Sequence, residues 1–270
     1  MDKLQEILDS AIYFSDNGDK NKAIELYLEI ISQKDDWSIP HYNLGLIYKY
    51  QLKWDLSFKH NYRAVELDPE YESSQWNLGI AATMLKEWKI ARRCWNNFGM
   101  NYKELDNNPA GDLGMAPIRM NPESEGEVIW ARRIDPARAK IKNIPLPESN
   151  HRFDDLVLND GAPMGTRVHN GKEYSVFNEL QIIEKSNYQT YSFECDFNTI
   201  KNYEILEQSC VTAEIEIENW TTDLEFLCRA CSEGKPHESH KQEPVFENKK
   251  MTIALASQNE DLLCETLNNW

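Results

Sequence analysis

The sequence predicts an α+β multidomain protein: an N-terminal α-solenoid of three helix pairs, followed by a β-rich α+β domain with a zinc knuckle. Three observations lead to this prediction. The first 103 residues repeat at a spacing of 34 residues. The apolar period then changes from 3.6 to 2 residues at about residue 127. Cysteines and histidines, both zinc ligands, gather at 228–240.

The repeat is carried by residue identities. Asn43-Leu44-Gly45 recurs as Asn77-Leu78-Gly79, and Trp54 recurs as Trp88. Small residues stand at matching places, which lets the two helices of a pair approach closely. They are Ala11, Gly45 and Gly79 on the first helices and Ala23, Ser57 and Ala91 on the second helices. The expected pairs are 2–16 with 20–34, 37–51 with 54–67, and 71–85 with 88–103.

Turn-forming residues separate the expected helices. Asp16-Asn17-Gly18-Asp19 tolerates turn geometry between the first two helices. Pro69 follows the second pair, where a helix must end. Four aromatic residues are expected to fill the space between successive helices: Phe14, Tyr48, Tyr27 and Trp95.

Over residues 1–103 this pattern resembles tetratricopeptide repeats (TPR), helix-turn-helix units that usually bind other proteins and perform no chemistry. Two positions depart from that family: Asn61 stands where an aromatic residue is usual, and Ala82 replaces a tyrosine. The resemblance implies that the first helix of each pair lines a concave groove, where an asparagine often bonds the backbone of a bound peptide. The expected partner-binding residues are Tyr42, Asn43, Leu46, Lys49, Trp76, Asn77 and Ile80.

The expected groove is mostly apolar and aromatic. Family members that clamp the terminal carboxylate of a peptide need lysines and arginines there, and this groove has little positive charge. Exposed apolar patches of this kind are rarely left bare. The cover is either the second half of the chain itself or a helix or strand of another protein.

Composition divides the chain into three parts. Residues 1–106 form the repeat domain, 107–126 a linker, and 127–270 a β-rich α+β domain that can be subdivided near 187. The first part of this domain predicts a small antiparallel sheet or partly closed barrel over 127–185, and the second a small α+β unit. The barrel strands are expected at 127–134, 139–144 and 156–158, and as a hairpin of 167–169 with 174–177. The α+β unit is expected to contain strands 191–197, 212–218 and 251–256 and helices 199–208 and 260–267.

Four zinc-ligand side chains lie close together in the sequence: Cys228, Cys231, His237 and His240. The cysteines have C-x2-C spacing and the histidines H-x2-H spacing, and four protein ligands fill the tetrahedron of a structural Zn²⁺ site. The alternative is two reduced cysteines and two exposed histidines in a loop. The remaining cysteines are expected to be buried fillers: Cys94, Cys195, Cys210 and Cys264.

Acidic residues outnumber basic ones by 45 to 29, for a net charge of −16. This balance argues against binding to nucleic acid or anionic membranes, which need Lys and Arg. It suits a basic protein partner, or it serves solubility alone. The sequence shows no signal-peptide pattern and no apolar run that spans a bilayer. A cytoplasmic location is expected, where the six cysteines stay reduced.

The sequence lacks familiar catalytic motifs: it has no P-loop, no Gly-rich dinucleotide fingerprint and no metalloprotease helix motif. No catalytic residue is assigned. His151-Arg152-Phe153-Asp154-Asp155 offers acid and base groups without a nucleophile beside them. The basic residues between 132 and 142 could meet phosphate, but ion pairs with surrounding carboxylates are the expectation. These residues are Arg132, Arg133, Arg138, Lys140 and Lys142.

The predicted function is that of a non-catalytic protein-binding protein, acting through the repeat groove and the acidic second domain. In general character the chain resembles small bacterial repeat proteins that serve as immunity partners of secreted toxins. That resemblance implies that the acidic domain blocks the basic active-site face of a toxin. The alternative is an enzyme whose active site lies in the β-rich domain, with the repeats recruiting its substrate.

Overall fold

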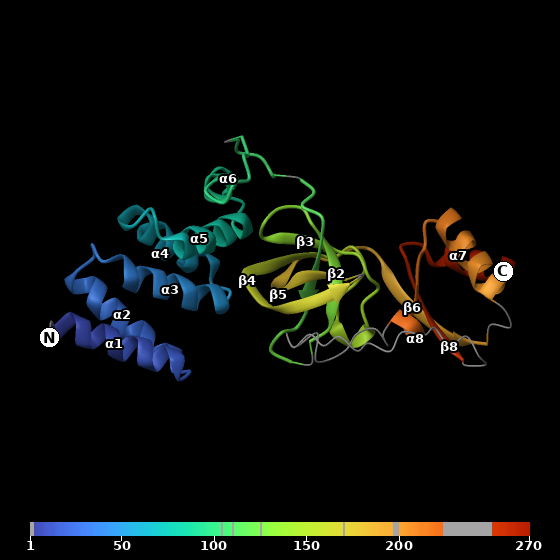
Figure 1. The fold of residues 1–270 in the computed structure, drawn as a ribbon, viewed down its shortest axis with the longest axis horizontal. Helices are drawn as coiled ribbons and strands as arrows, with labels where there is room; N and C mark the ends of the chain where they lie inside the picture. The colour runs from blue at the N-terminus through green and yellow to red at the C-terminus, as the bar shows by residue number, and fades with distance from the viewer. Residues whose placement is uncertain are drawn as a thin grey trace. The chain divides into compact units, whose positions relative to one another are not determined.

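The computed structural model describes residues 3–103, 105–109, 111–124, 126–169, 171–196, 200–223 and 250–270. The chain divides into two compact units, Met1–Ala110 and Gly111–Trp270. The first unit is helical, and the second is built on two sheets (Figure 1). Each unit has its own buried core, so each is described by itself.

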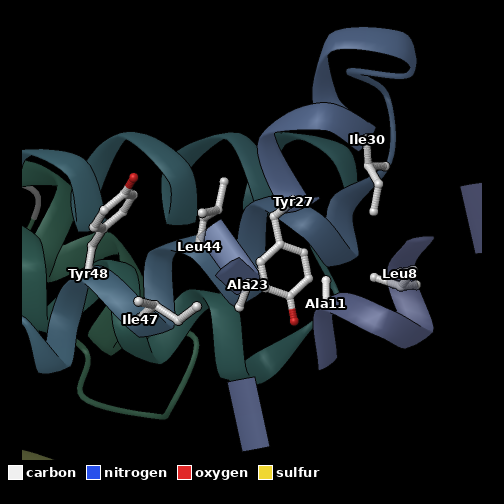
Figure 2. Close-up of a cluster of buried hydrophobic side chains, with 8 residues drawn as sticks. All are labelled: Leu8, Ala11, Ala23, Tyr27, Ile30, Leu44, Ile47 and Tyr48. Atoms are coloured by element: carbon white, nitrogen blue, oxygen red, sulfur yellow. The ribbon is translucent and has the colours of Figure 1, made fainter. Parts of the chain in front are cut away.

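The first unit consists of consecutive helix pairs, drawn from blue to green in Figure 1. The pairs are α1 (Lys3–Asp16) with α2 (Lys20–Gln33), α3 (Ser38–Tyr50) with α4 (Trp54–Leu67), and α5 (Glu72–Met84) with α6 (Trp88–Asn96). This arrangement confirms the helical, TPR-like character predicted for the N-terminal part. The first core cluster joins α1, α2 and α3. Figure 2 shows its side chains: Leu8, Ala11, Ala23, Tyr27, Ile30, Leu44, Ile47 and Tyr48.

Helix α6 ends earlier than the sequence predicted, at Asn96 and not at 103. Gly99 has φ +85°, and the backbone N–H of Met100 donates to the carbonyl of Trp95 at 3.2 Å, which is a glycine-terminated helix end. The side chain of Asn96 then holds Tyr102, because it accepts from the N–H of that residue at 2.6 Å and donates to its carbonyl at 2.8 Å. These local hydrogen bonds replace the ones that a longer helix would form.

Two glycines allow close approach within the second and third pairs. A Cβ on Gly45 would lie 2.4 Å from the Asn61 amide, and a Cβ on Gly79 would lie 2.5 Å from the Trp95 ring. Residues one period apart fill the same place in each pair: Tyr27, Asn61 and Trp95, all buried. Asn61 thus occupies the aromatic position of the repeat with a smaller, polar side chain.

The turns inside the three pairs share a left-handed residue at the same repeat position. Gly18 has φ +89°, Leu52 has φ +57° and Lys86 has φ +62°. Glycine adopts this region freely, whereas other residues do so at a cost of about 1 kcal/mol. The turn geometry is therefore a property of the repeat, and only the first pair has the residue that suits it best.

The second pair has a polar core. Nδ1 of His41 lies 3.2 Å from Nδ1 of His60, and both side chains are buried. Burial lowers the pKa of both imidazoles, that of His60 to about 4, so the pair is neutral at pH 7. Nearby, the Asn61 amide donates to the carbonyl of Ser57 at 2.9 Å, while its Oδ1 has no hydrogen-bond partner in the described part of the chain. The Ser57 hydroxyl donates to the carbonyl of Gly45 at 2.8 Å.

The second unit begins with a closed five-stranded barrel in the order β1-β2-β3-β4-β5. Its strands are β1 (Met115–Arg119), β2 (Val128–Arg133), β3 (Arg138–Ile141), β4 (Leu156–His169) and β5 (Lys172–Glu184). Neighbouring strands along the chain pair antiparallel, and β1 closes the barrel by pairing parallel with β5, where Ile118 lies opposite Phe177. A 3₁₀ turn, η1 (Pro147–Ser149), lies between β3 and β4.

Two sequence predictions about this region are wrong in detail. The stretch 107–126, expected as a linker, contains strand β1, because pairing with β2 and β5 overrides a composition rich in loop residues. The short strands expected at 156–158 and 167–169 are one strand, β4, whose register with β5 shifts at several points between Leu156 and Thr166. These β-bulges interrupt the alternation that marks a strand in the sequence.

The second sheet of this unit has the antiparallel order β6-β8-β7, with β6 (Gln189–Cys195), β7 (Glu216–Asn219) and β8 (Met251–Ser257). The helices are α7 (Ile200–Thr212), α8 (Trp220–Asp223) and α10 (Glu260–Asn269). Helix α7 reaches Thr212, so the strand expected from 212 begins only at Glu216. Glu214 has φ +55° and the N–H of Ile215 donates back to Cys210, which ends the helix there. Helix α8 is bonded to β8 next to the pairing of β7 with β8, because the N–H of Thr252 donates to the Thr221 hydroxyl at 2.7 Å.

The expected zinc ligands at 228–240 lie outside the described residues. Within the described ranges, no three His, Cys, Asp or Glu side chains are grouped so as to hold a metal ion. Among these same residues, no helix has the length and apolar content that a membrane crossing requires.

Candidate functional site

The candidate site lies on the first helix of each pair, to one side of the small residue that packs against the second helix. We call it the first-helix face and define it by residues 5, 8, 9, 12, 15 and 16 of α1 and their counterparts one and two periods later on α3 and α5. These places lie about 40° to 160° around a helix from Ala11, Gly45 and Gly79, which pack against the second helices. The seven predicted partner-binding residues all belong to this face.

Three of those seven residues are buried in the repeat unit. The amine of Lys49 donates to Oδ1 of Asn77 at 3.0 Å and packs over the ring of Tyr50 at 4.4 Å. Both Lys49 and Asn77 are buried, and Ile80 is completely so. The structure therefore brings Lys49 and Asn77 together as a cross-repeat contact between α3 and α5.

The other four are half-buried: Tyr42, Asn43, Leu46 and Trp76. The Tyr42 ring meets Tyr71 edge-on at 4.8 Å, and Trp76 packs against Trp95 and Phe98 at 5.2 and 4.7 Å. Asn43 differs from its counterpart Asn77, because its side-chain amide makes no hydrogen bond to any described residue. It therefore keeps a donor and an acceptor for a ligand.

Sequence reasoning missed two apolar members of the face. Ile39 is 40% exposed and Tyr50 is 58% exposed, while Ile12 on α1 is 37% exposed. Ile39 is the counterpart of Gln5, and Tyr50 is the counterpart of Asp16. Extending the 34-residue alignment to every first-helix position would have found both.

The acid and base groups of the barrel are mostly used internally. Nε2 of His151 lies 2.8 Å from the Glu179 carboxylate and its Nδ1 lies 2.7 Å from the Ser149 carbonyl. Burial by itself lowers the pKa of His151, but the hydrogen bond and charge of Glu179 outweigh it and the pKa is raised. Burial raises the pKa of the Glu127 carboxyl to about 7, although the N–H of Leu146 donates to it at 3.2 Å. The His151 ring is buried with both nitrogens bonded, so this cluster fastens the segment before β4 to β5.

The basic residues of the barrel form ion pairs, as the sequence predicted. The pairs are Lys140 and Lys142 with Asp154, Arg138 with Asp135, and Arg132 with Asp112. The guanidinium of Arg133 lies over the ring of Phe177 at 4.9 Å. The pairing of Arg138 with Asp135 is buried and also holds the turn between β2 and β3, because Asp135 accepts from the N–H groups of Ala137 and Arg138.

The cysteines outside the expected zinc segment divide by burial. Cys94 and Cys210 are buried, and burial raises the pKa of their thiols to about 12 and about 11, so they are inert fillers at neutral pH. Cys195 is half-buried. The prediction for Cys264 is wrong: it is exposed, because helix α10 buries Leu263 and turns the next position to solvent.

No family model matches the chain, and no curated protein matches it. Solved structures that are similar to it include the second TPR of Spaghetti (RPAP3) bound to the HSP90 peptide SRMEEVD. That structure is 22% identical, the match covers 35% of this chain and 88% of that chain, and the TM-score is 0.34. The TPR-like character of the first unit rests on its own helix pairs and their spacing, and the second unit is not assigned to a family.

Proposed function

We propose that the chain is a non-catalytic protein-binding protein that holds a segment of another protein on its first-helix face. One observation supports this proposal: the first-helix face combines the Asn43 amide, which bonds no described residue, with apolar side chains that are exposed. The amide suits the N–H and C=O groups of a peptide backbone. The apolar side chains Ile12 and Ile39 suit its side chains.

The expected energies match a reversible complex. Full burial of an isoleucine is worth about 2 kcal/mol, so covering the exposed part of Ile12 or Ile39 contributes about 1 kcal/mol each. A hydrogen bond to the Asn43 amide adds about 1 kcal/mol. Several such contacts, offset by the entropy of ordering the segment, favour a partner that exchanges over one that is held permanently.

Partner capture with the full chain tests the proposal. Ile39→Glu places a charge on the first-helix face, and Leu28→Glu places the same charge on α2, where Leu28 is 44% exposed. Capture from native lysate followed by mass spectrometry should enrich one partner with the wild type and with Leu28→Glu, and lose it with Ile39→Glu. Equal recovery with both variants would show that this face does not bind the partner.

A narrower form of the proposal makes the chain an adaptor or an immunity protein that neutralises a basic toxin domain. The net charge of −16 supports it through steering and complementarity. The complex should then weaken steeply between about 0.05 and 0.5 M salt, because exposed ion pairs are screened over a Debye length. A salt-independent complex would remove the basis for a basic partner.

We also propose that Cys228, Cys231, His237 and His240 hold a structural Zn²⁺ ion. The support is in the sequence: four ligand types at short spacing in a segment with few apolar residues of its own. Metal analysis of the purified chain should find one zinc per molecule, and Cys228→Ser should lower that amount. A folded wild-type protein without zinc would overturn this assignment.

A further inference from the structure

The exposed charged side chains of the first-helix face lie toward one end of it. Helix α1 contributes Asp9 and Asp16, both exposed. The Asp9 carboxylate accepts one hydrogen bond, from the Gln5 amide at 2.8 Å, and forms no ion pair with any residue that the structure describes. The counterparts of Asp9 and Asp16 on α3 and α5 are neutral: Asn43, Asn77, Tyr50 and Met84.

Lys49 on the face and Lys20 at the start of α2 do not neutralise Asp9, because each has other partners. Lys49, the lysine of the face, is only 2% exposed and donates to Asn77 on α5. Lys20 donates to the Ser15 carbonyl at 2.6 Å and to its hydroxyl at 3.2 Å. Asp9, Asn43 and Asn77 occupy the same position in successive repeats, and the exposed charge at that position is therefore negative.

We propose that the first-helix face takes a peptide segment that is apolar along α3 and carries a lysine or arginine over Asp9. This inference rests on the proposed function and adds the chemistry of the partner. Ile12 and Ile39 bury the apolar side chains of the segment, Asn43 bonds its backbone, and Asp9 pairs with its cation. An acidic segment would bring like charges together at α1, so repulsion weakens its binding.

The charge contribution is modest and measurable. An exposed ion pair changes an equilibrium about two- to fivefold. Reversal of Asp9 to lysine both removes the attraction and adds repulsion, so a cationic peptide should bind about tenfold more weakly. Glu29→Lys is the matched control, because Glu29 is an exposed acid of the same unit on α2, outside the face.

The experiment uses the full chain and a phage-displayed library of random dodecapeptides. Enriched peptides are synthesised and titrated by fluorescence anisotropy against the wild type, Asp9→Lys, Glu29→Lys and Ile39→Glu, each checked for helix content by circular dichroism. The expected result is enrichment of peptides with Lys or Arg, about tenfold weaker binding to Asp9→Lys, and binding to Glu29→Lys within about twofold of wild type. A peptide with its Lys or Arg changed to Glu should bind the wild type about tenfold more weakly, which tests the same pair without altering the protein.

Other outcomes overturn the inference in distinguishable ways. Enrichment of acidic or neutral peptides, or basic peptides that bind Asp9→Lys unchanged, would remove the assignment of a cationic partner. If those peptides still lose binding to Ile39→Glu, the proposed protein-binding face stands and only its charge preference fails. If no peptide is enriched, or if neither Ile39→Glu nor Asp9→Lys alters binding, both proposals fail.

Discussion

The second and third helix pairs fold alike but fill their cores with different chemistry. Both have a glycine where the helices meet, yet that glycine faces Asn61 in the second pair and Trp95 in the third. The second pair buries hydrogen-bonded polar groups, with His60 and Ser57 at the places that Cys94 and Ala91 occupy in the third. The repeat backbone therefore requires a filled space at these positions, and either polar or aromatic side chains fill it.

The two pairs are therefore sensitive to different changes. A rigid indole against a glycine tolerates no added atom, so the third pair depends on shape. A pair of buried imidazoles depends on being neutral, so the second pair depends on pH.

Adding one methyl group should separate the pairs most clearly. Gly79→Ala should lower the free energy of unfolding by about 3 kcal/mol or more, because the new Cβ would lie 2.5 Å from the buried Trp95 ring. Gly45→Ala should cost about half as much, since it meets the smaller side chain of Asn61. Urea denaturation of both variants measures the difference. Equal losses would show that shape matters as much in the second pair as in the third.

Acid should destabilise the unit through the second pair. The folded-state pKa values of His41 and His60 lie below their ordinary value, so the unfolded chain binds more protons. Stability is then complete above about pH 6.5 and falls by about 2 kcal/mol as the pH drops toward 4. His60→Phe should flatten this decline and cost about 1 kcal/mol at a pH of about 7.5, where it leaves His41 without its partner. An unchanged pH dependence of urea unfolding in the variant would contradict the role of the pair.

Removing polarity from the second pair should stabilise it. Asn61→Leu eliminates a buried Oδ1 that has no partner in the described chain, while Ser57 keeps its hydrogen bond to Gly45. We expect a gain of about 1 kcal/mol in the free energy of unfolding. Asn21→Leu, at an exposed place on α2, controls for the exchange itself and should change stability by less than about 0.5 kcal/mol. A loss in Asn61→Leu would show that its bonds to Ser57 outweigh the unpaired oxygen.

The smallest effect is expected in the turns. Lys86→Gly should raise the free energy of unfolding by about 0.5 kcal/mol, since Gly18 adopts the same left-handed conformation in the first pair. Leu52→Gly should gain less, because Leu52 also lines a surface cavity of about 360 Å³ with Leu56. Thermal unfolding monitored by circular dichroism measures both. A larger gain in Leu52→Gly would mean that its apolar contacts contribute little.

The repeat arrangement was predictable because it is periodic. Alignment at 34 residues correctly places Gly45, Gly79 and Trp95 where helices meet, and it marks Asn61 as unusual for its position. The contact between His41 and His60 could not be predicted in this way. It depends on how α3 and α4 rotate against each other, which neither spacing nor residue type reveals.

The β-rich part was less predictable for a related reason. Strand β1 contains Pro117 and is short, and only its pairing with β2 and with the distant β5 makes it a strand. For the first-helix face, periodicity predicts the position of Asn43 but not that its side-chain amide is unbonded. That amide is left over because Lys49 reaches Asn77 and not Asn43, a fact of three-dimensional packing.

The antiparallel pairing of β7 with β8 has a consequence for how this sheet forms. Asn219 lies opposite Ile253, and Thr221 bonds Thr252, so residues far apart in the sequence must meet before the sheet is complete. The entropic cost of bringing such residues together grows only slowly with their separation in the sequence. The sheet can therefore be completed by contacts made at the two ends of a long separation.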